Sequence, residues 1–79
     1  MSNLKKYKQV FVESFELEDE SSLDALEYNQ IAEWDSIGHM TMVAEIEEAF
    51  DITLEADDIL NFGSFKKGFE ILSKYDVQL

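Results

Sequence analysis

The sequence predicts an all-α fold, a small four-helix bundle of three longer helices and one short helix. A long loop is expected between the first and second helices. Three observations carry this prediction. Apolar residues recur at the three- to four-residue spacing of amphipathic helices, no stretch shows strand-like alternation, and proline, which interrupts helices, is absent. At 79 residues the chain has room for a single domain, residues 1–79.

The first helix is predicted from about residue 2 to residue 15, with Ser2 as a possible cap. One of its faces carries four large apolar side chains: Leu4, Tyr7, Phe11 and Phe15. A connection of about residues 16–34 follows. Its irregularly spaced apolar residues fit a loop that folds over the helix ends, with room for one helical turn. A loop of this length in so small a domain is unusual unless it is functional or packed by its own side chains.

The strongest helical pattern runs from Ser36 to Phe50, with Asp35 or Ser36 as its cap and Asp51 at its end. At 100° per residue, five side chains fall on one core-facing arc roughly 100° wide: His39, Met42, Val43, Ile46 and Phe50. Outside that arc, beside Ser36, lie three more apolar residues and two acidic ones: Ile37, Met40, Ala44, Glu47 and Glu48. The helix is more apolar than one core requires, which indicates a docking surface around Ser36.

A short third helix is predicted at residues 56–61, with Ile59 and Leu60 as its apolar anchors. Phe62 should pack immediately after this helix, and Gly63 should provide the turn that follows it. These features predict a compact connection to the last helix.

The last helix is predicted from about residue 65 to residue 74, capped by Ser64. Its inner face would carry Phe65, Phe69 and Leu72. Gly68 falls at the edge of that face, although glycine within a helix costs about 1 kcal/mol relative to alanine. We therefore expect another helix to approach closely there.

Charge excludes several functions. Six basic residues against 18 acidic ones give a formal net charge of −12, so the surface repels nucleic acid and anionic membranes and favours basic partner surfaces. No segment is long and apolar enough to span a bilayer, and no apolar signal core follows the first residues. We predict no stable membrane insertion, a cytoplasmic location and a monomer. Cysteine is absent, so the side chains supply neither disulfides nor thiol chemistry.

This chain resembles the acyl carrier protein family in having an Asp-Ser pair at the start of an acidic, amphipathic second helix. The resemblance is carried by Asp35-Ser36-Ile37, Met42-Val43, Ile46-Glu47-Glu48 and Phe50-Asp51. It extends over the whole chain, because length, acidity, helix order and the place of the serine all fit.

The resemblance implies that Ser36 carries 4′-phosphopantetheine, with Asp35 as part of the attachment site. A phosphopantetheinyl transferase would add this group from coenzyme A. A helix N-terminus suits the phosphodiester, because its free N–H groups and positive dipole end favour an anion. The chain would then be a carrier and not an enzyme, holding acyl intermediates as thioesters.

The resemblance also implies partners: acyl-loading enzymes, synthases or acyltransferases with basic docking surfaces. They would contact the apolar flank and its acidic frame, namely Ile37, Met40, Ala44, Glu47 and Glu48. Thr41 stands where many fatty-acid carriers have an acidic residue, and Trp34 precedes the Asp-Ser pair. In both features the chain looks like carriers of specialised pathways, such as polysaccharide, lipid-modification or secondary-metabolism pathways, and not like the housekeeping fatty-acid carrier.

In the carrier family, the space between the second, third and last helices can take up the acyl chain. Here that space would be lined by Ile46, Ile59, Phe62, Gly68, Phe69 and Leu72. The bulk of Phe62 predicts a shallow cavity and a short or polar cargo. An ordinary filled core is the alternative interpretation of the same residues.

Other interpretations of the site stay open. Ser36 could be a simple cap, and the chain could be an unmodified acidic helical interaction module (an adaptor). Trp34 could cover the helix end or contact a partner. His39 could be packed with its nitrogens satisfied by loop backbone, or could contact the arm or a partner. Hydrolase chemistry at Ser36 is disfavoured because His39, the single histidine, points inward, and no second histidine or cysteine could complete a metal site with it.

Overall fold

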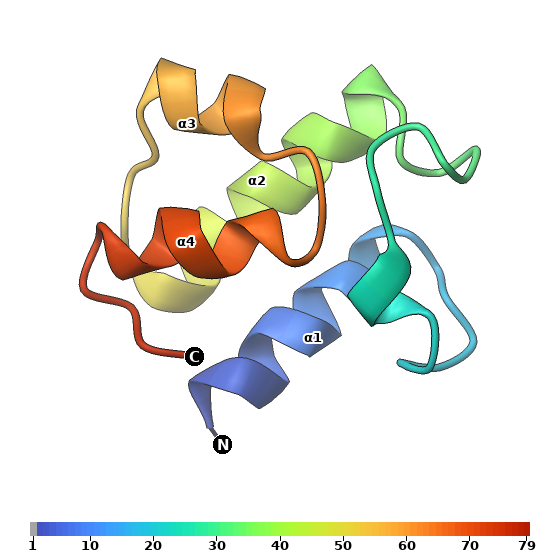
Figure 1. Ribbon diagram of the computed structural model, residues 1–79, viewed down its shortest axis with the longest axis horizontal. Helices are drawn as coiled ribbons and strands as arrows, with labels where there is room; N and C mark the ends of the chain where they lie inside the picture. The colour runs from blue at the N-terminus through green and yellow to red at the C-terminus, as the bar shows by residue number, and fades with distance from the viewer. Residues whose placement is uncertain (1) are drawn as a thin grey trace.

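The computed structural model describes residues 2–79 and consists of helices joined by loops (Figure 1). The elements are α1 (Asn3–Ser14), the 3-10 helix η1 (Leu23–Ala25), α2 (Ser36–Phe50), α3 (Ala56–Asn61) and α4 (Lys67–Ser73). Residues 2–79 form no strand, and their one β-like pairing is an isolated bridge between Glu27 and Ser64. The predicted all-α bundle, with a long loop between its first two long helices, is confirmed. Within the same residues, no helix combines the length and apolarity needed to cross a bilayer.

Helix α1 begins and ends close to its predicted bounds. The Ser2 hydroxyl accepts a hydrogen bond of 3.1 Å from the backbone N–H of Lys5, which makes Ser2 the N-cap. At the other end, the N–H of Phe15 bonds to the carbonyl of Phe11. The apolar face is buried as predicted, with Leu4 half-buried at its edge.

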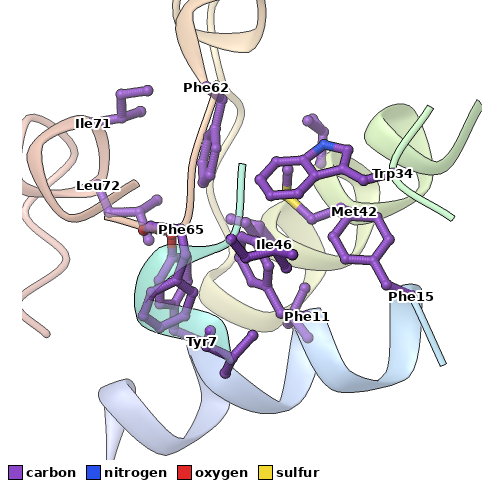
Figure 2. Packing of buried hydrophobic residues seen from close by; sticks show 14 of the residues in the cluster. Tyr7, Phe11, Phe15, Trp34, Met42, Ile46, Phe62, Phe65, Ile71 and Leu72 are labelled. Carbon is purple, nitrogen blue, oxygen red and sulfur yellow. Dashed lines mark hydrogen bonds between the residues drawn. The ribbon is translucent and has the colours of Figure 1, made fainter. Parts of the chain in front are cut away.

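The core is dominated by aromatic rings gathered around Phe11 (Figure 2). The ring centroid of Phe11 lies 5.0 Å from that of Tyr7, 5.1 Å from that of Phe65 and 5.4 Å from that of Trp34. Trp34 also stacks on Phe15 at 4.9 Å. Such pairs contribute about 0.5–1.5 kcal/mol each beyond their area burial. Trp34 is 0% exposed, so it closes the core beneath the start of α2 and is not available to a partner.

The long loop between α1 and α2 is packed and not free. Leu23 in η1 and Leu26 are buried, and η1 provides the single helical turn that the sequence allowed. Two backbone hydrogen bonds tie the loop to the α3–α4 connection: Tyr28 N–H to the Gly63 carbonyl at 2.9 Å, and Phe65 N–H to the Leu26 carbonyl at 3.0 Å. The loop therefore reaches α2 along a fixed path.

Helix α4 begins two residues later than predicted. The N–H of Phe65 is used in the pairing with the loop, so the chain turns helical only after that residue. The Ser64 hydroxyl still accepts a hydrogen bond of 2.9 Å from the N–H of Lys67. Phe69, predicted on the inner face, is 37% exposed, and Ile71 is buried in its place.

The close approach predicted at Gly68 is confirmed. A Cβ atom at Gly68 would lie 1.8 Å from the hydroxyl oxygen of Tyr7 on α1. That buried hydroxyl donates to the carbonyl of Phe65, and burial raises the pKa of Tyr7 above its ordinary value. Only a residue without a side chain allows Tyr7 to sit against α4.

Helix α3 corrects the prediction that Ile59 and Leu60 are both anchors. Ile59 is half-buried, whereas Leu60 is 82% exposed. Neighbouring positions on a helix are 100° apart, and the core lies on one side of this short helix. The buried polar residue of α3 is Asp58, which accepts hydrogen bonds from the Lys74 ammonium and the Tyr75 hydroxyl just beyond α4.

Candidate functional site

Ser36 is the first residue of α2, and its side chain is exposed. Of the two predicted caps, Asp35 is the one used: its Oδ1 accepts a hydrogen bond of 2.8 Å from the N–H of Gly38. Within residues 2–79, the N–H groups of Ser36 and Ile37 make no hydrogen bond. The serine hydroxyl therefore stands beside two unpaired donors at the positive end of a fifteen-residue helix.

Gly38 fixes how α2 meets the preceding loop. A Cβ atom at this position would lie 1.9 Å from the backbone carbonyl oxygen of Glu33, a separation that no side chain tolerates. The contact excludes any residue with a side chain at this position. Gly38 lets the loop pass directly against the first turn of α2, next to Ser36.

The predicted apolar flank of α2 is exposed. Ile37 is 77% exposed, Met40 is 52% exposed, and Ala44 is exposed one turn further along. The structure adds Leu60 of α3, which sequence reasoning had placed in the core. Met40 and Leu60 line the same cavity, so the patch spans two helices. We call Ile37, Met40, Ala44 and Leu60 the apolar patch.

The two acidic residues predicted to frame this patch differ in their contacts. Glu47 is half-buried, and its Oε2 accepts a hydrogen bond of 2.8 Å from the N–H of Leu54. It holds the segment after α2 in place. Glu48 is exposed, and within residues 2–79 it makes no ion pair or side-chain hydrogen bond. Glu48 and the remaining oxygen of Asp35 are the acidic groups that a partner could meet.

A cavity of about 420 Å³ opens beside Ser36. Its lining residues come from the loop, the start of α2, α3 and the turn after α3: Tyr28, Ser36, His39, Met40, Ile59, Leu60, Phe62 and Gly63. It is the cavity nearest to the candidate attachment site, because Ser36 forms part of its wall.

Of the residues predicted to line an acyl pocket, Ile59 and Phe62 line this cavity. The others do not: Ile46, Gly68 and Leu72 are buried, and Phe69 is partly exposed on α4 outside the lining. The physical reason is the fully buried ring of Phe62, which fills the space between α2 and α4 and packs 6.5 Å from the ring of Tyr7 (Figure 2). The filled-core interpretation holds for those residues, and the open space is displaced towards Ser36.

His39 lies in the wall of this cavity with both ring nitrogens engaged. The indole N–H of Trp34 donates to Nδ1 at 2.9 Å, and Nε2 lies 2.8 Å from the carbonyl oxygen of Ile59. Because indole can only donate and a carbonyl can only accept, this network assigns the neutral tautomer with its proton on Nε2. The sequence suggested that loop backbone satisfies both nitrogens. In the structure one nitrogen meets a backbone carbonyl of helix α3, and the other meets the side chain of Trp34.

A polar cluster on the far side of α3 completes the support of the cavity. The Lys74 ammonium and the Tyr75 hydroxyl each donate a hydrogen bond of 2.5 Å to the Asp58 carboxylate. These bonds, the one from Lys74 most, lower the pKa of Asp58. The pKa of Lys74 is raised by the same contact. The Tyr75 hydroxyl also accepts from the N–H of Glu55 at 3.0 Å. Helix α3 is thus held by His39 on one side and by this cluster on the other.

Together these residues define a small, acidic all-α protein with an exposed serine between a helix start, an apolar patch and a cavity. No family model, curated protein or solved structure matches the chain. The functional assignment therefore rests on the geometry of this site and on the sequence pattern.

Proposed function

We propose that this chain is an acyl carrier protein whose attachment serine is Ser36. The observation that carries the proposal is the position of the Ser36 hydroxyl: exposed at the first residue of α2, beside the apolar patch and in the wall of a cavity. A serine that served only as a cap would accept a backbone hydrogen bond, and here Asp35 fills that role.

The residues present suit a 4′-phosphopantetheine group. The unpaired N–H groups of Ser36 and Ile37, together with the positive end of the helix dipole, favour a phosphodiester on the serine oxygen. When bound, the group would supply the thiol that the cysteine-free chain lacks, and that thiol would carry acyl groups as thioesters. The chain's own residues orient the attachment point: Asp35 fixes the start of α2, and Gly38 fixes the loop against it.

The surface around Ser36 suits brief contacts with several enzymes. A net charge of −12 accelerates encounter with basic partner surfaces, and Asp35 and Glu48 place carboxylates next to the apolar patch. The partners we propose are a phosphopantetheinyl transferase and the synthases or acyltransferases of a specialised pathway in the cytoplasm. The patch would supply specificity, because exposed Ile37 and Leu60 lose water only in a matching contact.

The proposed carrier catalyses nothing by itself. Both nitrogens of His39, the one histidine in the sequence, are engaged by Trp34 and by the Ile59 carbonyl. The imidazole therefore does not serve as a base for Ser36, which supports a passive tether over a nucleophile.

Loading with a broad-specificity phosphopantetheinyl transferase and coenzyme A tests the assignment. Intact mass should show one added phosphopantetheine on the parent chain and none on Ser36→Ala. Ser22→Ala is the matched control: Ser22 is exposed and precedes η1, and its side chain caps nothing. Circular dichroism should show that both variants keep the fold. Equal labelling of Ser36→Ala and the parent, or no labelling of either, would remove the assignment.

The second candidate is an unmodified adaptor that binds one basic partner. The favouring observation is the 82% exposure of Leu60 and the 77% exposure of Ile37, which would suit a docking contact without any prosthetic group. The adaptor predicts that the protein purified from its own cells has the mass of the bare polypeptide. The carrier predicts a covalent increment at Ser36.

A further inference from the structure

The cavity beside Ser36 has the size of a small-molecule site and a lining without formal charge. Its volume of about 420 Å³ falls within the roughly 300–1,000 Å³ typical of ligand pockets. Its lining contains no lysine, arginine, aspartate or glutamate, and the tautomer of His39 is the neutral one. A charged acyl group would lose its hydration there without gaining an ionic side-chain partner, because the anion-favouring N–H groups at the start of α2 serve the phosphodiester. The cavity therefore favours a neutral group.

Three of the lining residues carry rings: Tyr28 and His39 are accessible, whereas Phe62 is fully buried. The His39 ring is perpendicular to that of Tyr28, at 89° and 5.4 Å, and nearly perpendicular to that of Phe62, at 76° and 6.4 Å. Hydrogen bonds to Trp34 and Ile59 hold His39 in this orientation before any ligand arrives. A planar ring entering the cavity would meet the edges and faces that aromatic groups prefer, with the Met40 thioether as a further favourable contact.

The cavity does not continue into the protein. Four core side chains are fully buried, and none of them lines the cavity: Trp34, Met42, Ile46 and Leu72. A long alkyl chain would find no path between them and would leave its tail in water. A short cargo, as the bulk of Phe62 predicts, suits this closed floor.

We propose that this cavity binds a short, neutral acyl group that carries a planar ring, of the arylacetyl or arylpropenoyl class. The proposal deepens the carrier function and rests on it for the source of the acyl group. Binding itself needs only the residues of the cavity, so it can be tested on the unmodified chain.

The test uses free thioesters of N-acetylcysteamine, which reproduce the acyl end of the arm without attachment to Ser36. Phenylacetyl and octanoyl thioesters have the same number of acyl carbons and differ in the ring, and a succinyl thioester adds a charge. Titration of the ¹⁵N-labelled protein, followed at the Gly63 amide, should give a Kd about fivefold lower for phenylacetyl than for octanoyl. The succinyl thioester, whose carboxylate the net charge of −12 repels, should bind more weakly than the phenylacetyl thioester. Octanoyl or succinyl binding as tight as phenylacetyl, or no saturable binding of phenylacetyl, would overturn the proposal.

Two tryptophan substitutions on one helix locate the binding. Met40→Trp fills the mouth of the cavity, and Ala44→Trp adds the same ring one turn away, outside the lining. We expect phenylacetyl binding to be lost in the first and kept in the second. If Met40→Trp does not fold, Leu60→Trp replaces it, because Leu60 is 82% exposed and also lines the cavity. Binding kept in the mouth variant would contradict the site.

The outcome is separable from that of the loading experiment. Thioester binding without loading at Ser36 would leave the cavity as a ligand site and remove the carrier function. Loading without thioester binding would keep the carrier and remove the ring-bearing cargo.

Discussion

The buried indole N–H of Trp34 donates a hydrogen bond of 2.9 Å to Nδ1 of His39. This bond joins the aromatic core to the wall of the cavity, and through Nε2 it extends to the carbonyl oxygen of Ile59 on α3. A single imidazole ring thus links the core, α2 and α3.

Replacing His39 by leucine should destabilise the fold. The change leaves the Trp34 N–H buried without an acceptor, which costs about 1–3 kcal/mol. His39→Gln keeps a donor and an acceptor on one side chain and should recover part of that loss. Urea denaturation followed by circular dichroism measures both variants. A leucine variant as stable as the glutamine variant would show that the hydrogen bonds of His39 contribute nothing.

Gly38→Ala should be costly because the new methyl group meets the Glu33 carbonyl oxygen at 1.9 Å. Relief requires the loop or the first turn of α2 to move, and such overpacking costs about 1–3 kcal/mol. Gly63→Ala is the matched control, since its Cβ would meet nothing closer than 3.9 Å and its φ is not positive. Thermal unfolding should separate the two variants. The rate of loading at Ser36 should fall in Gly38→Ala and stay unchanged in Gly63→Ala.

The two acidic residues beside the apolar patch should respond differently to alanine. Glu47→Ala removes the acceptor for the Leu54 N–H and should lower the free energy of unfolding by about 1 kcal/mol. Glu48→Ala should change stability by less than about 0.5 kcal/mol, because its carboxylate is exposed and makes no such bond. Equal urea midpoints for the two variants would contradict the structural role of Glu47.

Acid should weaken the hydrogen-bonded contact between α3 and the end of α4. Hydrogen bonds from Lys74 and Tyr75 hold the pKa of Asp58 below its ordinary value of 3.8. The ionised carboxylate therefore stabilises the fold above pH 3.8, and this contribution disappears as the pH falls through the lower folded-state pKa. The Lys74 side chain is 60% exposed, so water screens the ion pair with Asp58. We therefore predict the sign of the change in stability with pH.

The measurement is the free energy of unfolding of the parent and of Asp58→Asn across acidic pH. The parent should be the more stable near neutral pH, and the difference should shrink in acid. Asp57→Asn, which makes the same charge change on an exposed neighbour, should show no such convergence. A difference between the parent and Asp58→Asn that stays constant with pH would exclude the linkage.

Acidic substitutions in the apolar patch should slow recognition by the transferase. Met40→Glu and Leu60→Glu place a charge where we expect a partner contact, and we expect kcat/KM for loading to fall by about five- to thirtyfold. Ala25→Glu, an exposed apolar-to-acidic change in η1, controls for the added negative charge. Equal rates for all three variants would place docking elsewhere.

Local sequence patterns predicted most of the fold. The period of apolar residues placed α1 and α2 to within one residue at each end, because their caps and core faces lie within the same short stretches. The bounds of α3 also agree with the prediction, although its core-facing side did not. The interpretation of Gly68 also held. A glycine that weakens its own helix indicates that another element approaches it, although the sequence does not name Tyr7 as that element.

What the sequence did not predict depends on pairing between distant segments. The bond from Phe65 to Leu26 delays α4, and the space that Phe62 fills with Tyr7 removes Ile46, Gly68 and Leu72 from the pocket. Leu60 was misplaced because apolar character alone does not say which side of a six-residue helix meets the core. For the exposed flank beside Ser36, the helical arc was sufficient, since Ile37, Met40 and Ala44 lie on a helix long enough to define its faces.

The buried indole gives the protein an optical reporter of its own. Trp34 is the one tryptophan in the sequence and is 0% exposed, so its emission should be blue-shifted in the native state and should move to longer wavelength when the core opens. Because its N–H is bonded to His39 in the cavity wall, the same signal should respond when a guest packs against that ring. Occupancy and unfolding can then be followed in solution without any dye.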